Sequence, residues 1–149
     1  VNWQEHNQAI HANSQVAIFE PSTEELGALA EVATKVSYSL TILSSEPGKY
    51  RHLSQHKIVD LKNSSGTLKK ADILLIPCEA ALKNGGVVTR SGALMLAIAA
   101  KSFSVPVVIL ATCYTLTNRF CYEPNSFSCL QNPYDHFQQT SSTHCTMLI

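Results

Sequence analysis

The chain has 149 residues, of which 45% are hydrophobic and 15% are charged, and its formal net charge is zero. This length and composition place it among soluble globular domains with one core. No apolar run approaches the roughly 20 residues of a membrane span, and no secretion leader is recognisable. Because the chain starts with a valine and ends on the apolar triplet Met147-Leu148-Ile149, we expect it to be a fragment of a longer protein.

A strand, an amphipathic helix and a second strand are predicted in the first third of the chain. After a short helix expected at residues 3–12, the apolar run from Val16 to Phe19 predicts the first strand. Ser22 and Glu25 have the spacing of a capping box, which starts a helix. The run from Leu40 to Leu43 predicts the next strand. This order favours parallel strands joined by a right-handed crossover.

The remainder of the chain continues the alternation of strands and helices. A weaker strand is predicted from Lys57 to Leu61, and a loop at residues 63–66. Two runs rich in β-branched residues, Ile73 to Ile76 and Val105 to Leu110, predict strands buried on both faces. Residues 94–100 between them predict a helix that is apolar nearly all the way round. We therefore predict an α/β fold, a Rossmann-like doubly wound and mainly parallel sheet with helices on both faces.

Charged residues and cysteines add little evidence for chemistry. Bases outnumber acids from Lys49 to Lys70, which predicts a solvated face, with an acidic partner or nucleic acid as the alternative. His52 and His56 are four residues apart, but no third ligand is placed to complete a metal site. The spacing of the five cysteines does not match a zinc site, so we expect free thiols in a reducing cytoplasm. We expect no metal and no cofactor.

The stretch from Ala71 to Ala111 contains a series of short motifs that together resemble a known family. The motifs are Ala71-Asp72, Glu79-Ala80, Asn84-Gly85-Gly86-Val87, Gly92, Leu96-Ala97, Ala100-Lys101 and Val105-Pro106-Val107. The family is the C-terminal domain shared by the regulatory subunits of eukaryotic translation initiation factor 2B and by methylthioribose-1-phosphate and ribose-1,5-bisphosphate isomerases. Tyr114-Thr115-Leu116 resembles the beta subunits, whereas Thr89-Arg90-Ser91-Gly92 is delta-like.

The resemblance implies one Rossmann-like domain over residues 1–149, without the helical domain that precedes it in the family and without the family's closing strand. It also implies a cytoplasmic, non-catalytic scaffold within the guanine nucleotide exchange factor for initiation factor 2. Such a subunit assembles with other subunits and senses phosphorylated initiation factor 2, without contacting nucleic acid or membrane. The Gly-rich reversal and the apolar helix suit a partner interface. The expected interface residues are Asn84, Gly85, Gly86, Thr89, Arg90, Leu94, Tyr114 and Leu116.

The alternative is a sugar-phosphate isomerase or sensor of the same superfamily. The isomerases use a cysteine after the first strand and an aspartate after the strand that precedes Asn-Gly. Glu20 and Glu79 occupy these positions, so we interpret them as vestigial. Ser44 to Gly48 also lacks the arginine with which sugar-phosphate binders clamp phosphate. For Glu79 we expect hydrogen bonds to neighbouring backbone N–H groups.

Overall fold

The structure is a computed structural model that describes residues 10, 12–53, 55–83, 85–112, 115–118 and 144–147. The chain divides into two compact units. Unit 1 consists of Val1–Pro77 and Met95–Leu110, and unit 2 consists of Cys78–Leu94 and Ala111–Ile149. Among the described residues, no helix is long and apolar enough to cross a membrane. The helix expected at residues 3–12 falls almost wholly outside the described residues.

Unit 1 contains a five-stranded sheet in which every pairing is parallel. Its order is β3-β2-β1-β4-β7. The strands are β1 (Gln15–Phe19), β2 (Ser39–Ser44), β3 (Lys57–Asp60), β4 (Ile73–Pro77) and β7 (Val107–Leu110). All of these strands were predicted, and the parallel α/β class is confirmed.

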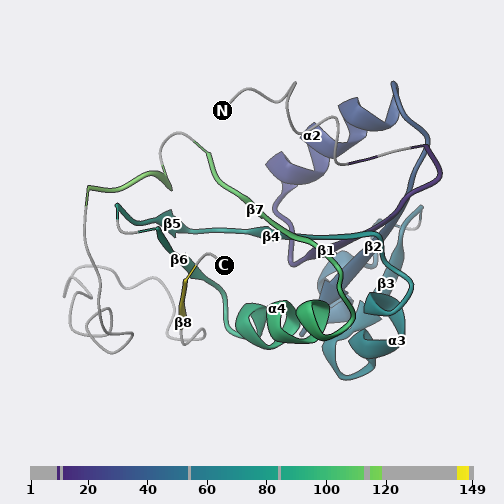
Figure 1. Cartoon of the computed structure of the whole chain (residues 1–149). Helices are drawn as coiled ribbons and strands as arrows, with labels where there is room; N and C mark the ends of the chain where they lie inside the picture. Colours follow the sequence, from purple (N-terminus) through teal and green to yellow (C-terminus); the bar gives the residue numbers. More distant parts are fainter. Residues whose placement is uncertain are drawn as a thin grey trace. The chain divides into compact units, whose positions relative to one another are not determined.

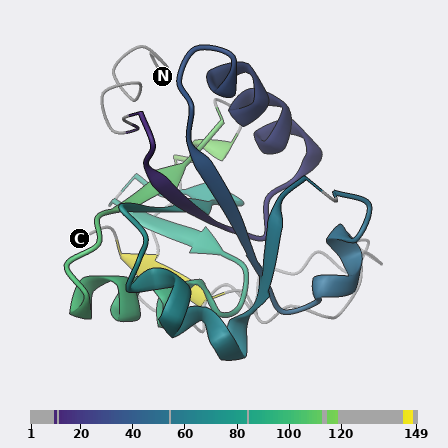
Figure 2. The same cartoon turned by 90° about the vertical axis from the view of Figure 1, so that its right-hand side faces the viewer.

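Helices cover both faces of this sheet, as predicted for a doubly wound fold. Helix α2 (Thr23–Ala33) lies on one face, and α3 (Ser64–Leu68) and α4 (Ala93–Ser102) lie on the other (Figures 1 and 2). The predicted capping box is confirmed, because the Ser22 hydroxyl accepts from the Glu25 N–H and the Glu25 carboxylate accepts from the Ser22 N–H. A short 3-10 turn, η1 (Pro47–Tyr50), follows β2.

Two element boundaries differ from the prediction for local reasons. The loop expected at residues 63–66 is wrong, because η2 (Leu61–Asn63) and α3 occupy this stretch. The Asp60 side chain caps η2 by accepting from the Lys62 N–H at 3.0 Å, and Leu68 is fully buried. Strand β7 starts later than predicted because the Val105 N–H bonds to the Ala100 carbonyl at 2.9 Å and so closes the end of α4.

The core of unit 1 follows the alternation of side chains along the strands. The even-numbered residues of β1 and β2 pack with Leu29 of α2 in one cluster, which also contains the odd-numbered residues Ile73 and Leu75 of β4. The members from β1 and β2 are Val16, Ile18, Leu40 and Ile42, with Ile58 of β3 at the edge. Leu68, Leu96 and Ala100 are buried on the helices of the opposite face. Burial on both faces accounts for the continuous apolar runs in the sequence.

Unit 2 contains a small antiparallel sheet that the sequence analysis did not predict. Its strands are β5 (Ala80–Ala81), β6 (Gly86–Thr89) and β8 (His144–Met147), in the order β5-β6-β8. The Gly-rich segment in which a reversal was predicted lies between β5 and β6, and its Gly85 has the positive φ of +84° that a tight turn needs.

Candidate functional site

The carboxyl edge of the five-stranded sheet is where an open α/β sheet normally binds a ligand. Strand β1 pairs with β2 on one side and with β4 on the other. From β1 the chain adds β2 and β3 toward one edge of the sheet, and it then adds β4 and β7 toward the other edge, so the order of the strands reverses between β1 and β4. Ligands of doubly wound sheets bind outside the carboxyl ends of the strands at such a reversal. The residue that follows β1 is Glu20, one of the predicted vestigial positions.

Glu20 is held by unit 1 itself. Its carboxylate accepts hydrogen bonds from the Ser45 N–H at 3.0 Å, from the Ser44 hydroxyl at 3.4 Å and from the Ser45 hydroxyl. Its own N–H donates to the Leu43 carbonyl at 3.0 Å. The backbone of Glu20 has a φ of +39°, in the left-handed region that side chains with a Cβ rarely adopt. The carboxylate therefore ties the end of β1 to the end of β2.

Glu79 lies in unit 2, directly before β5. Its N–H donates to the Val88 carbonyl at 2.8 Å, and its carboxylate lies 3.5 Å from the Arg90 guanidinium nitrogen Nε. The side-chain partner is therefore an arginine rather than the backbone N–H groups that we expected. Both side chains are partly exposed, so solvent screens this ion pair. Cys78 is buried, with its Sγ 4.0 Å from the Thr115 hydroxyl.

The expected interface residues differ in their accessibility. Leu94 is 40% exposed and Leu116 is 58% exposed. Gly85 is exposed as well, and Arg90 is partly exposed in its ion pair with Glu79. Gly86 and Thr89 are buried. Asn84 and Tyr114 lie outside the described residues.

Unit 1 exposes three large apolar side chains in its second segment, Met95–Leu110. Met95 and Ile98 of α4 are 55% and 60% exposed, and Phe103, just after the helix, is 40% exposed. We call these residues the α4 patch. From the sequence we predicted only that this helix is apolar on nearly every side, so that its exposed side would also be apolar. Within the described residues, no group of His, Cys, Asp and Glu could hold a metal ion, and His52 and His56 form none.

The sequence of the chain is similar to those of known proteins. A family model described as "Initiation factor 2 subunit family" matches residues 59–145. Translation initiation factor eIF2B subunit beta of Dictyostelium discoideum is 24% identical to the chain over 141 residues. This alignment covers 87% of the chain but only 36% of that protein, so the chain spans about a third of its relative's length.

Solved structures resemble the fold at low sequence identity. A crystal structure of the tetrameric eIF2B-beta2-delta2 complex from C. thermophilum matches with a TM-score of 0.68 and 20% identity, over 85% of this chain and 45% of that chain. The translation initiation factor eIF-2B of Pyrococcus horikoshii OT3 matches with a TM-score of 0.64 and 18% identity, over 74% of this chain and 44% of that chain.

Proposed function

The chain belongs to the initiation factor 2 subunit family, and we propose that it forms part of a non-catalytic subunit of the guanine nucleotide exchange factor for translation initiation factor 2. In this proposal it acts in the cytoplasm as an assembly module. It pairs with a second copy or with another subunit of the factor, and within the complex it contributes to sensing phosphorylated initiation factor 2.

The α4 patch is the observation on which this proposal depends. Met95, Ile98 and Phe103 are large apolar side chains near one another in sequence, and each is exposed. Single exposed apolar residues are ordinary, whereas contiguous apolar patches mark sites of protein–protein interaction. We take these three residues, which lie on and just after one helix, as such a site. The relatives support this reading, because one is an eIF2B beta subunit and one solved structure is a complex of beta and delta subunits.

The state of Glu20 supports a non-catalytic role. An isomerase of the superfamily would need a thiol at this position, whereas the chain has a carboxylate that Ser44 and Ser45 already bind. A carboxylate with these partners also opposes the approach of a phosphate.

The proposal is tested by the association state of the chain, measured by sedimentation over a concentration series. We expect concentration-dependent association that is unchanged by ribose-1,5-bisphosphate or methylthioribose-1-phosphate. Changing Met95 and Ile98 together to lysine should weaken association at least tenfold, because the new charges would have to be desolvated in the interface.

A matched control adds the same charges elsewhere. Ala30 and Ala33 are exposed positions of α2, and changing both to lysine should leave association unchanged. Equal weakening by both pairs of substitutions would remove the α4 patch from the proposal. Turnover of either sugar phosphate would overturn the non-catalytic assignment.

A further inference from the structure

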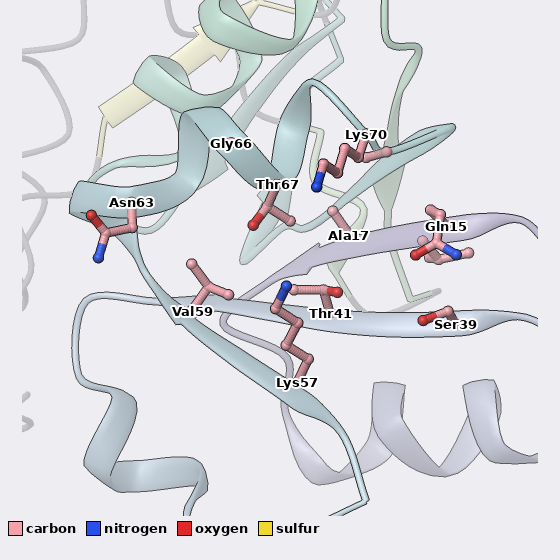
Figure 3. A pocket seen from close by; sticks show the side chains of 12 residues that line it. Gln15, Ala17, Ser39, Thr41, Lys57, Val59, Asn63, Gly66, Thr67 and Lys70 are labelled. Atoms are coloured by element: carbon pink, nitrogen blue, oxygen red, sulfur yellow. The ribbon is translucent and has the colours of Figure 1, made fainter.

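A hollow of about 460 Å³ lies within unit 1, between α3 and the strands β1, β2 and β3 (Figure 3). It is separate from the carboxyl edge of the sheet, because it uses the first residues of these strands. The strand residues that line it include Gln15 of β1, Ser39 of β2 and Lys57 of β3. The proposed assembly role does not use this surface.

The floor of the hollow is polar where a sheet face in this fold is normally apolar. The strand register places Ala17 beside Thr41 and Thr41 beside Lys57, so the three residues form one row across the sheet. In the adjacent row Gln15 lies beside Ser39. Thr41 lines the hollow and is only 7% exposed (Figure 3).

This polarity is confined to the amino half of the strands. Two residues further along, Phe19 and Leu43 occupy the same face and are fully buried apolar side chains. The small side chain of Ala17 gives the hollow its depth. Along the wall, α3 contributes Gly66, at which an added Cβ would meet no atom within 4 Å. The short helix therefore leaves open a part of the sheet that bulkier residues would fill.

Two lysines supply the charge of the hollow. Lys57 on β3 and Lys70, just after α3, extend their ammonium groups into the space that also holds the Thr41 and Thr67 hydroxyls (Figure 3). No acidic side chain lines this space, and within the described part of the chain neither lysine forms an ion pair.

The nearby carboxylates have other partners. Asp72 accepts from the Gln15 N–H at 2.8 Å, and Asp60 accepts from the Lys62 N–H at 3.0 Å. The two positive charges that face this space repel each other, and an anion between them would be attracted to both, which would offset their repulsion. The hollow is therefore complementary to a negatively charged group.

We propose that this hollow binds the phosphate group of a small phosphorylated molecule. Lysine binds phosphate as a point charge, whereas the planar, bidentate recognition typical of carboxylates uses arginine, which is absent from the lining. Hydroxyl groups donate the remaining hydrogen bonds to a tetrahedral oxyanion. The volume lies within the range of about 300–1,000 Å³ for small-molecule sites. Ala17, Val59 and Ala71 offer apolar contacts to the rest of the ligand.

The test is an NMR titration of the whole chain with inorganic phosphate and with ribose 5-phosphate, followed at the amides of Thr41 and Thr67. Ribose and succinate serve as the uncharged and the carboxylate controls. We expect saturable shifts at both amides with the two phosphate compounds only. Changing Lys57 and Lys70 together to glutamine should weaken binding at least tenfold.

The control variant removes the same charge from the same segment. Lys62 and Lys69 are exposed and do not line the hollow, so their joint change to glutamine should leave the affinity within about twofold. Equal weakening by both double variants would overturn the proposal, as would shifts that do not saturate or succinate binding as tightly as phosphate. If the first double variant does not fold, Thr67→Glu is the second test, because a carboxylate there should abolish phosphate binding.

Discussion

At the scale of single residues, Glu20 combines a strained backbone with a carboxylate that makes hydrogen bonds. Glu20→Ala and Glu20→Gly both remove the carboxylate, but only glycine adopts a φ of +39° without steric cost. We expect Glu20→Ala to lower the free energy of unfolding by about 1–2 kcal/mol, because hydrogen bonds to a charged group are lost. Glu20→Gly should be about 1 kcal/mol more stable than Glu20→Ala. Urea unfolding followed by circular dichroism measures both.

The comparison has an internal control at Lys35. This residue is exposed and its φ is not positive, so Lys35→Ala should be at least as stable as Lys35→Gly. If alanine were also the more stable substitution at position 20, the left-handed backbone at Glu20 would be contradicted.

The position of Glu20 could be predicted from the sequence, but its partners could not. The apolar run that ends at Phe19 places the next residue at the carboxyl edge of the sheet. The hydrogen bonds from Ser44 and Ser45 depend on the pairing of β1 with β2, which brings together residues far apart in the chain. The same holds for Glu79 and Arg90, which the hairpin of β5 and β6 aligns.

At the scale of elements, Tyr38 connects the segment before β2 to helix α2. Its hydroxyl donates to the Leu29 carbonyl, and burial raises the pKa of Tyr38 above its ordinary value of 10.0. Because the pKa is higher in the folded state, the unfolded chain ionises first as the pH rises above 10.0. The stabilisation that Tyr38 gives is therefore complete below this pH and is lost as the pH rises through the folded pKa.

Tyr38→Phe is the variant that isolates this contribution. It should be less stable than the original chain by about 1 kcal/mol at neutral pH, because one hydrogen bond is lost. The difference in unfolding free energy between the two proteins should then shrink above pH 10.0. Urea unfolding at a series of pH values measures the difference. A difference that stays constant or grows at high pH would contradict the assignment.

The elements of the five-stranded sheet and helix α2 were predictable from their sequence patterns, whereas α3 and the strands of the small sheet were not. Strands β1, β2, β4 and β7 follow from apolar runs, β3 was predicted as a weaker strand, and α2 follows from its capping box. Helix α3 was missed because Ser64, Ser65 and Gly66 favour loops, yet burial of Ser64 and Leu68 overrides this local preference. The strands β5 and β6 are too short to show a period, and β8 pairs with β6 from far along the chain.

At the scale of the whole molecule, the α4 patch and the phosphate hollow should respond in opposite ways to salt. Raising the ionic strength from about 0.1 M to about 1 M shortens the Debye length from about 10 Å to about 3 Å. Phosphate binding between Lys57 and Lys70 should weaken severalfold. Association through Met95 and Ile98 should stay the same or strengthen, because the interface is apolar. Sedimentation and NMR titration at both ionic strengths measure these effects, and association that weakens with salt would contradict an apolar interface.

The strand order also bears on how the chain is made. Strand β1 is synthesised before β4, which is one of its two neighbours in the sheet, and Ile18 can pair with Leu75 only after the ribosome has passed β4. Pairing between such distant segments must overcome a loop-closure entropy before any contact compensates for it. During translation β1 therefore has one unpaired edge, which other strands can join. A nascent chain that stalls before Ile73 should for this reason aggregate more readily than one that stalls after Pro77.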